Sequence, residues 1–444
     1  MRDKKGKIPD CPHLSLNMKT AIKRLPRSQV EIFFEIRPEE FKDSIEKAIF
    51  NLGKDLEIEG FRKGQTPKEI IIQKIGQDKI LALATQLAVE ENYFREIFAQ
   101  KLEVISQPDI QILSEPFFDK GLTFKTVFTI LPEITLPDYK NIASQVKRKE
   151  IFVEEKEIED ALLYLQKSRA KFIFENRPAK KGDFVEIEFQ SPQIEQGLKR
   201  KDNFILGEGH FVFGFEEKLE GMAPGQEKDF SLKFPGNYFQ KDLADNLINF
   251  KAKMNSVQKM ELPEISDEFA KNLGKFENLI SLKENIKEGI KMEKENFESQ
   301  KIREEILEKI TRETKMETPE VLIEAEKGRM LEDLKNLVTE RFKISPSDYL
   351  AKIKKTEKEL LESFSNEAEK KVKYALILKE ISKRKKIEVS EEEIKVAINE
   401  FLKNYPSSEK DKKALDLEKL KSYYEEVIRN EKTLQMLEGL ATHL

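Results

Sequence analysis

Glycine and proline are distributed unevenly along the chain, and this distribution limits where helices and strands can form. Residues 182–236 hold eight of the 18 glycines, whereas residues 264–444 hold only four. Three prolines follow Pro263, namely Pro319, Pro346 and Pro406. Glycine and proline mark turns and interrupt helices. The pattern therefore predicts a β-rich domain in the middle of the chain, followed by a long helical region rich in Lys and Glu.

Length and charge limit the organisation of the chain and its partners. A chain of 444 residues is too long for one compact core, so we expect two to four domains. The 79 Lys and Arg nearly balance the 83 Asp and Glu, and the net charge of −4 argues against a dedicated DNA-binding protein. Charged residues make up 36% of the chain, so we expect long helices with much exposed surface.

Cysteine content and apolar runs favour a cytoplasmic protein. The one cysteine, Cys11, has no second cysteine in the chain to pair with, which fits a reducing compartment. No run approaches the roughly 18 consecutive apolar residues that a membrane span needs, and the N-terminus lacks the apolar middle region of a signal peptide. Because Met18 begins a more convincing reading frame, we expect residues 1–17 to be a disordered extension or the result of a mis-assigned start.

The first zone, residues 18–130, mixes helical and strand patterns. Hydrophobic periodicity predicts strands at Val30–Ile36, Val104–Leu113 and Leu122–Ile130, and helices from Pro38 to about Glu57 and from Lys68 to Lys101. Pro38 suits the first turn of a helix, where its missing N–H costs little. We expect helices packed on one face of a small antiparallel sheet.

The remaining chain divides into a connector, a strand-rich segment and a helical region. Residues 131–163 carry two prolines and then a charged helix, and they form the connector. In the strand-rich segment, Phe184–Phe189 and Asp229–Phe234 alternate apolar and polar residues. Beyond Pro263, apolar residues keep roughly helical spacing at Leu279, Ile286, Ile290, Phe297, Ile302, Ile306 and Ile310. No fixed-period repeat is visible.

A short basic loop lies between the two helices of the first zone. It runs Gly60-Phe61-Arg62-Lys63-Gly64-Gln65-Thr66-Pro67. Arg and Lys can meet phosphate or carboxylate, and Phe can fill a small pocket in a partner. The alternative interpretation is a plain helix–helix turn, because the loop lacks the spacing of a phosphate-cradling Walker motif.

The string GFRKGQTP resembles the GFRxGxxP signature of the ribosome-binding domain of the trigger factor family. In that family the tip of this loop binds a ribosomal protein beside the exit tunnel and neighbouring ribosomal RNA. The resemblance implies that the tip is Phe61, Arg62 and Lys63. The predicted ribosome-binding residues are Gly60, Phe61, Arg62, Lys63, Gly64 and Pro67.

A second resemblance lies in the middle of the chain. Five segments are similar, in order, to an FKBP-type peptidyl-prolyl isomerase domain: Gly182–Phe189, Gly207–Gly209, Val212–Glu217, Leu219–Met222 and Phe234–Tyr238. The resemblance implies an apolar prolyl pocket, with Phe215 as its leading member. The implied wall consists of Phe189, Leu206, Val212, Phe215, Tyr238 and Phe250. The same aromatic residues could instead be simple core, and in a small barrel the two roles overlap.

An apolar pocket suits prolyl isomerisation. Rotation about the peptide bond faces a barrier of roughly 18–20 kcal/mol, and the twisted amide carries less charge separation than the planar one. A water-poor pocket therefore favours the twisted form, with no nucleophile or general base. The only histidines are His13, His210 and His443, and no metal-ligand or nucleotide-binding spacing appears. We therefore expect neither a metal nor another cofactor.

Two departures from the FKBP-type pattern bear on catalytic efficiency. The family usually has an Asp-Gly-x-x-Phe segment after the first strand, where this chain has the shorter Ser191–Leu198 without that Asp or Phe. The usual Ile-Pro-Gly-Phe-Glu is here Val212-Phe213-Gly214-Phe215-Glu216, with Phe213 in place of Pro. We expect the fold to tolerate both changes.

The helices after Pro263 leave three interpretations open: a coiled coil, a solvated scaffold or a client-binding cradle. Periodicity alone favours the scaffold, because charge runs are usually solvated faces and heptads are not sustained. The trigger factor resemblance covers nearly all of the chain beyond Met18. It implies that the connector and the C-terminal helices form one body that binds unfolded chains weakly and broadly.

Together these features predict an α+β multidomain protein. It would have an N-terminal α/β ribosome-binding domain (18–130), a connector (131–163), an inserted FKBP-like β-rich isomerase domain (164–262) and an elongated all-α C-terminal domain (263–444). The implied partners are the ribosome and nascent or unfolded polypeptides, with no membrane and no DNA, and the free protein could be a homodimer. The resemblance also implies links to protein export and cell division.

Three hypotheses compete for the function. The first is a ribosome-associated chaperone with an isomerase module. The second is a free FKBP-type isomerase whose helices raise substrate affinity, and it predicts no dependence of ribosome binding on Phe61, Arg62 and Lys63. The third is an elongated scaffold, which predicts no suppression of aggregation.

Overall fold

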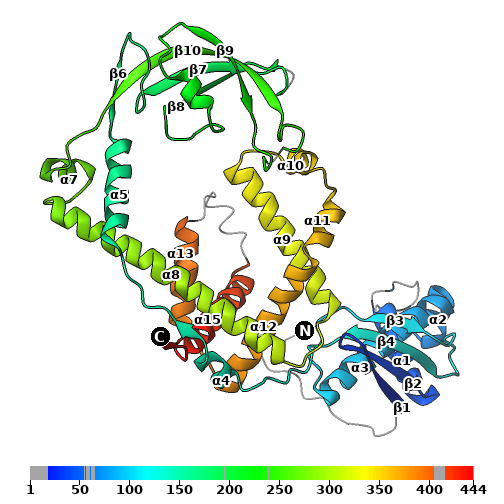
Figure 1. Ribbon diagram of the computed structural model, residues 1–444. Helices are drawn as coiled ribbons and strands as arrows, with labels where there is room; N and C mark the ends of the chain where they lie inside the picture. Colours follow the sequence, from blue (N-terminus) through cyan, green and yellow to red (C-terminus); the bar gives the residue numbers. More distant parts are fainter. Residues whose placement is uncertain are drawn as a thin grey trace. The chain divides into compact units, whose positions relative to one another are not determined.

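The computed structural model in Figure 1 describes residues 19–54, 56, 61, 66–194, 197–238, 240–404 and 416–443. The expected extension at residues 1–17, with Cys11, lies outside these residues. The chain forms two compact units. The first comprises Met1–Arg148 and Gln300–Leu444, and the second comprises Lys149–Ser299. The second unit is thus inserted into the sequence of the first. In the ranges described, no helix is both long and apolar enough to cross a membrane.

The N-terminal part of the first unit contains a four-stranded antiparallel sheet. Its strand order is β1 (Lys19–Leu25), β2 (Gln29–Ile36), β4 (Leu122–Thr129) and β3 (Asp109–Ile112). The predicted strands at Val30–Ile36 and Leu122–Ile130 are confirmed. Of the predicted strand Val104–Leu113, only β3 forms, although Val104 makes an isolated bridge to Ile130. Strand β1 was not predicted.

Three helices accompany this sheet: α1 (Pro38–Gly53), α2 (Lys68–Ile75) and α3 (Gln77–Gln100). Pro38 occupies the first turn of α1, as predicted. The single helix predicted from Lys68 to Lys101 is wrong, because Gly76 adopts φ +89° and separates α2 from α3. Glycine has no Cβ and tolerates this conformation, so the chain can turn there between two helices.

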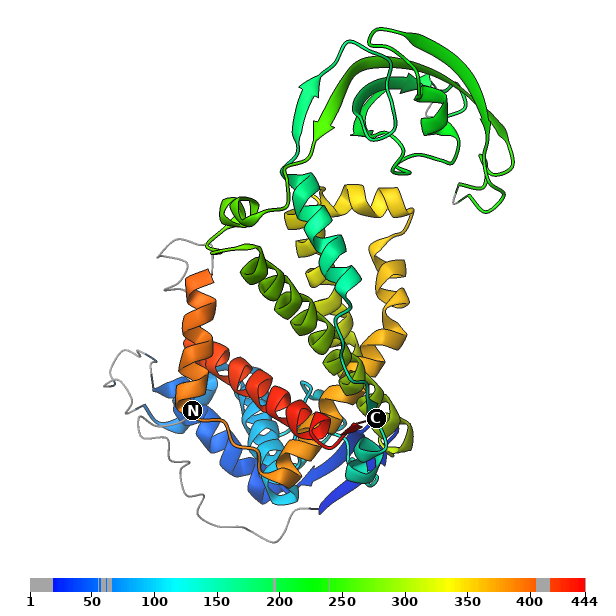
Figure 2. The ribbon, with the colours of Figure 1, turned by 60° about the vertical axis from the view of Figure 1, so that its left-hand side comes forward.

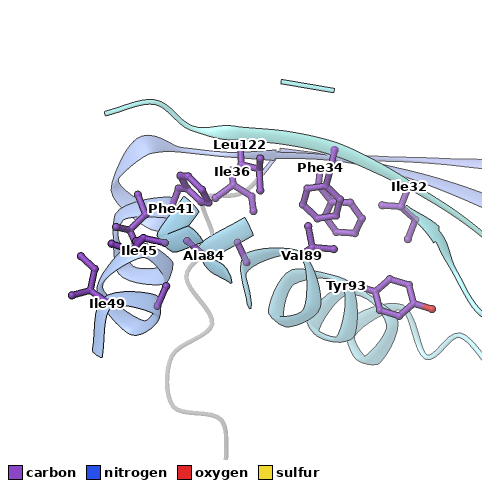
Figure 3. Close-up of a cluster of buried hydrophobic side chains, with 14 of the residues drawn as sticks. Ile32, Phe34, Ile36, Phe41, Ile45, Ile49, Ala84, Val89, Tyr93 and Leu122 are labelled. Carbon is purple, nitrogen blue, oxygen red and sulfur yellow. The ribbon is translucent and has the colours of Figure 1, made fainter. Parts of the chain in front are cut away.

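The core of this part lies between the sheet and the helices (Figure 3). Alternate residues of β2 are buried, and Phe34 stacks on Phe124 with ring centroids 4.5 Å apart. Phe41 and Ile45 of α1, together with Ala84 of α3, pack against the same face. The prediction that helices pack on one face of a small antiparallel sheet is therefore confirmed.

The rest of the first unit is mainly helical. Its elements are α4 (Tyr139–Ser144), β5 (Lys147–Arg148), α9 (Glu320–Arg341), α10 (Pro346–Ile353), α11 (Glu357–Ser363), α12 (Ser365–Lys385), α13 (Glu391–Asn404), α15 (Leu417–Glu438) and β11 (Thr442–His443). Residues of α4, α12 and α15 share a core with the last turns of the long helix α8 (Leu279–Glu313). The short strand β11 pairs in parallel with β5.

The second unit holds a five-stranded antiparallel sheet. Its elements are β6 (Lys171–Phe174), β7 (Phe184–Gln190), β8 (Arg200–Ile205), α6 (Phe215–Leu219), β9 (Glu227–Lys233) and β10 (Leu247–Glu261). The order is β6-β10-β7-β8, and β9 also pairs with β10. The ladder between β10 and β7 shifts register between Met254 and Ser256, which marks a bulge. The short helix α6 lies in the curve of the sheet (Figures 1 and 2).

Helices α5 (Glu155–Ser168) and α7 (Asp267–Leu273) complete the second unit. They form a small core with the first turns of α8. The apolar residues predicted along α8 thus pack in two separate cores. Leu279, Ile286 and Ile290 pack in this small core, whereas Ile302, Ile306 and Ile310 are buried in the core of the first unit. Phe297 is the exception, because its ring is exposed.

Candidate functional site

A cluster of aromatic rings occupies the second unit, with Phe215 at its centre. Phe215 begins α6 and is 1% exposed. Its ring centroid lies 5.7 Å from that of Phe189 on β7 and 5.1 Å from that of Phe250 on β10. Phe211 stacks on it at 4.5 Å, and Phe230 of β9 meets it at 5.2 Å. Rings from three strands and one loop therefore meet the Phe215 ring of α6.

The six predicted pocket residues all belong to this cluster or pack against it. Leu206, Phe215 and Phe250 are buried members of the core. Phe189, Val212 and Tyr238 are half-buried and pack against that core. The buried three hold the shape of the cluster, whereas the half-buried three have surface left for a ligand. One cluster thus supplies both the buried core residues and the half-buried residues of the candidate pocket.

Four aromatic residues among those described in the cluster were not among the predicted site residues, and one of them, Phe204, meets Phe211 with ring centroids 4.9 Å apart. Phe211 stacks on Phe215, Phe230 also meets that ring, and Phe234 stacks on Tyr238 with centroids 4.7 Å apart. The alternation in Asp229–Phe234 could have identified Phe230 and Phe234, because it places both rings on one face of the strand. Phe211 lies in a loop, where no periodicity could have identified it.

The carboxylate of Glu216 fixes the loop that carries Phe211. Its Oε2 accepts hydrogen bonds from the backbone N–H groups of Gly207 (2.6 Å) and Gly209 (3.2 Å), and Oε1 accepts one from Phe211 (3.1 Å). Burial alone would raise the pKa of Glu216, but these backbone donors outweigh burial and hold that pKa below its usual value. An ionised Glu216 therefore ties residues 207–211 to the start of α6.

A tight turn precedes Phe215. The N–H of Phe215 donates to the carbonyl oxygen of Val212 at 3.0 Å. Gly214 has φ +90° and ψ −15°, and Phe213 is not one of the residues with positive φ. This combination defines a type II turn with Phe213 at its second position, where Pro is favoured, and with glycine at the third. The turn therefore forms with Phe213 in place of Pro, and its ring is 86% exposed.

A cavity of about 220 Å³ lies beside this turn. Leu206, Phe211 and Val212 line it and also belong to the aromatic cluster or pack against it. Phe213 lines it as well. Lys181, Glu216, Glu217 and Glu220 supply its charged lining. The cavity therefore shares two lining side chains, Leu206 and Val212, with the candidate prolyl pocket.

Segment 191–198, which differs from the usual FKBP-type pattern, contains no aromatic residue and so contributes no ring to this site. Ser191 is buried, and its hydroxyl accepts a hydrogen bond from the Gln193 N–H at 3.3 Å. The side-chain oxygen of Gln193 accepts one from the Asn249 N–H at 3.4 Å. The segment is thus connected to β10 through polar contacts.

The loop between α1 and α2 carries the other predicted site. Phe61 is 41% exposed. Gly60, Arg62, Lys63 and Gly64 lie outside the residues that the structure describes. Pro67 precedes α2 as its N-cap, and its carbonyl oxygen accepts from the Ile71 N–H at 3.1 Å.

Within the described ranges, no group of three or more His, Cys, Asp or Glu side chains is arranged to hold a metal ion. His210 stacks on Phe204, and its Nε2 lies 3.3 Å from Oδ2 of Asp202.

Comparison with known proteins assigns the family. Residues 18–165 match the family model of bacterial trigger factor protein, and residues 278–438 match the model of its C-terminus. Residues 175–255 match the model of FKBP-type peptidyl-prolyl cis-trans isomerase. A trigger factor of Caldicellulosiruptor saccharolyticus is 32% identical over 91% of this chain and 90% of its own length. The chain belongs to the trigger factor family.

A second trigger factor, from Carboxydothermus hydrogenoformans, is 31% identical over 95% of this chain and 98% of its own length. A solved structure of the trigger factor chaperone is 21% identical, covers 94% of this chain and 99% of its own, and has a TM-score of 0.49. Family membership confirms both resemblances and the α+β multidomain fold class, with an N-terminal trigger factor domain, an FKBP-type β-rich domain and a helical C-terminal domain. It favours a chaperone with an FKBP-type domain over a free isomerase.

Proposed function

We propose that this member of the trigger factor family is a ribosome-associated chaperone. It binds nascent chains at the exit tunnel, holds them in a folding-competent state and catalyses cis–trans isomerisation of X-Pro bonds. One observation carries the proposal: the two trigger factor models and the FKBP-type model match successive parts of one chain. The cytoplasm is its proposed location, and a homodimer is the proposed free state.

Ribosome binding is assigned to the loop tip at Phe61, Arg62 and Lys63. Phe61 is exposed and lies between α1 and α2 in the sequence, and both helices pack in the core of the N-terminal domain. Two neighbouring cations can contact RNA phosphates or a ribosomal protein's carboxylates, while the ring fills a pocket in that protein. Phosphate contacts make such binding weaken as salt rises.

Isomerase activity is assigned to the half-buried side of the aromatic cluster. Phe189, Val212 and Tyr238 would contact the prolyl ring, and buried Phe215 supports them. These apolar side chains exclude water, which favours the twisted amide over the more polar planar one. No proton transfer is needed, so the chain's contribution is binding, shape and exclusion of water.

Client binding is assigned to the helical C-terminal domain (263–444) together with the connector (131–163). The other two proposed domains are 18–130 for ribosome binding and 164–262 for isomerisation. Exposed apolar side chains are scattered along these helices among many charges. Examples are Ile280, Met292, Phe297, Val396, Leu417 and Tyr423. Small separated patches bind weakly and release easily, which suits a chaperone without a nucleotide cycle. Absence of any suppression of aggregation of a denatured test protein would instead support the scaffold hypothesis.

Ribosome co-sedimentation at low and moderate salt tests the first assignment. The variant Phe61→Ala/Arg62→Ala/Lys63→Ala should fail to pellet with ribosomes. The matched control Lys74→Ala/Lys79→Ala/Phe98→Ala removes two exposed cations and one exposed ring elsewhere in the same domain. It should pellet like the wild type. Equal pelleting of the loop variant and the wild type would favour the free isomerase instead.

Relaxation of an X-Pro peptide from a cis-enriched state tests the second assignment. The full-length protein should accelerate relaxation, and Phe189→Ala/Tyr238→Ala should lose most of that acceleration. The control Phe174→Ala removes an exposed ring of β6 in the same unit and should keep it. A wild-type rate equal to that of buffer would refute isomerase activity.

A further inference from the structure

Phe213 and Phe215 are two residues apart and have opposite environments. Phe215 is 1% exposed at the centre of the aromatic cluster, whereas Phe213 is 86% exposed on the turn that leads into it. Isolated exposed apolar residues are common on protein surfaces. The position of Phe213 in the turn and beside the cavity distinguishes it from the other exposed rings.

The backbone on both sides of Phe213 is fixed. The hydrogen bond from the Phe215 N–H to the Val212 carbonyl closes the turn, and Gly214 provides the positive φ that the turn requires. Before the turn, Glu216 holds the N–H of Phe211, whose ring stacks on Phe215. The exposed ring therefore projects from a rigid support, so a ligand would not have to order the loop in order to use it.

The ring of Phe213 lies at a cavity whose wall is partly apolar. Leu206, Phe211 and Val212 contribute to that wall. Lys181 contributes the methylene groups of its side chain, because a Cβ built on Gly207 would lie 2.7 Å from Lys181 Cγ. Such stems cover apolar surface while the ammonium group stays in water. The cavity can therefore take an apolar side chain and shares its wall with the prolyl pocket.

We propose that Phe213 determines specificity for the residue beside the proline of a client. Its ring and the adjoining 220 Å³ cavity bind an apolar side chain next to the prolyl ring. This inference rests on the proposed isomerase function, because it assumes that the proline binds to the aromatic cluster. The turn position favours Pro on backbone grounds, so the ring is the feature that a phenylalanine adds there.

Peptides with one varied position test the proposal in the full-length protein. One series varies the residue before the proline among Gly, Leu and Phe, and a second series varies the residue after it. Phe213→Pro keeps the turn and removes the ring, and Phe213→Ala removes the ring alone. We expect KM for the Leu and Phe peptides to rise about fivefold in one series for both variants, with kcat changed less than twofold. Such a pattern reports the loss of a contact that binds the ground state and the transition state equally. KM for the Gly peptide should not change.

Phe174→Ala is the matched control, because Phe174 is 74% exposed in the same unit but does not line this cavity. It should behave like the wild type with every peptide. Unchanged KM values for both Phe213 variants in both series would overturn the inference.

A binding measurement separates failure of this inference from failure of the proposed catalysis. Fluorescence anisotropy gives the affinity of a labelled peptide that contains Leu next to Pro, and the same peptide with Ala in place of Pro corrects for binding elsewhere on the chain. If the wild type does not accelerate isomerisation, isomerase activity is refuted. An affinity that still falls about fivefold in Phe213→Pro would then support the contact between Phe213 and the residue beside the proline. Equal affinities of the wild type and Phe213→Pro would refute the contact, whatever the rates.

Discussion

The N-terminal sheet and the aromatic cluster place neighbouring phenylalanines in opposite environments by different means. In β2, Phe34 is buried and the adjacent Phe33 is 38% exposed, because successive strand residues point to opposite faces. At the turn before α6, a glycine with positive φ separates Phe213 from Phe215, and the buried carboxylate of Glu216 holds the loop before the turn. The first arrangement follows from periodicity, and the second from specific tertiary contacts.

The difference shows why one region is easier to predict from sequence than the other. Where helices cover one face of a sheet, burial and structural role coincide, and Phe34 is simply core. In the aromatic cluster the buried and half-buried rings touch one another, so a ring can support the fold and the site together. Residue type alone cannot separate these roles.

The largest expected effect comes from removing the central ring of each region. Phe34→Ala and Phe215→Ala should each destabilise the surrounding core by about 3–5 kcal/mol, through lost burial and a cavity. Because the two rings belong to different compact units, Phe34→Ala should reduce ribosome co-sedimentation and spare peptide isomerisation. Phe215→Ala should reduce peptide isomerisation and leave ribosome co-sedimentation unchanged. Amide hydrogen exchange in β2 and β7 measures each local stability in the full-length chain. A Phe215→Ala protein with unchanged exchange in β7 would contradict a shared core and site.

Much of the fold could be predicted from hydrophobic periodicity. Alternation identified β2, β4, β7 and β9, and helical spacing identified α1 and most of α8. Strand β1 was missed because its residues facing the helices, Thr20, Ile22 and Arg24, include one apolar side chain. The break at Gly76 was missed because an isolated glycine within a helical pattern is often tolerated.

The second-largest effect is expected from Glu216→Gln. A buried carboxylate that accepts three backbone N–H bonds should contribute about 2–3 kcal/mol to the stability of the second unit. The folded-state pKa of Glu216 lies below its usual value. This contribution is therefore present above the unfolded-state pKa of about 4.3 and is lost as pH falls through the folded-state value.

Hydrogen exchange of β7 amides between pH 7 and acidic pH checks this dependence. The difference between wild type and Glu216→Gln should shrink on acidification. Glu217→Gln, at the exposed neighbouring position, should change little at any pH. A Glu216→Gln difference that stays constant with pH would show that the charge is not the stabilising feature.

The candidate site was only partly predictable, because some of its residues are placed by tertiary contacts that leave no periodic pattern in the sequence. Family resemblance supplied six pocket residues, and the structure places all six in or against one cluster. The position of Phe211 depends on the bonds from residues 207–211 to Glu216, a contact with no periodic pattern. At the ribosome-binding loop, the resemblance remains the basis for Gly60, Arg62, Lys63 and Gly64, which the structure does not describe.

A smaller effect is expected from the glycines of the turn and its neighbouring loop. Gly214→Ala should cost about 2 kcal/mol, because the residue has φ +90° and a new Cβ would lie 3.2 Å from Leu232 Cδ2. Gly209→Ala should cost about 1 kcal/mol, because φ is +78° but nothing lies within 4 Å of the new Cβ. Hydrogen exchange in β9 and β10 measures both. Equal costs would mean that Leu232 moves away freely and that only the backbone conformation matters.

The smallest expected effect has the opposite sign. Phe213→Pro should stabilise the second unit by about 0.4–1 kcal/mol, because proline reduces the conformational entropy of the unfolded chain. Within the described residues the Phe213 N–H donates no hydrogen bond, so proline removes none. Phe213→Ala lacks this entropic gain and serves as the control in the same exchange experiment. A Phe213→Pro protein that is more stable but binds peptide more weakly would mean that Phe213 contributes to ligand binding at the expense of stability. A destabilised one would mean that the turn, like the cluster behind it, depends on its phenylalanine for folding.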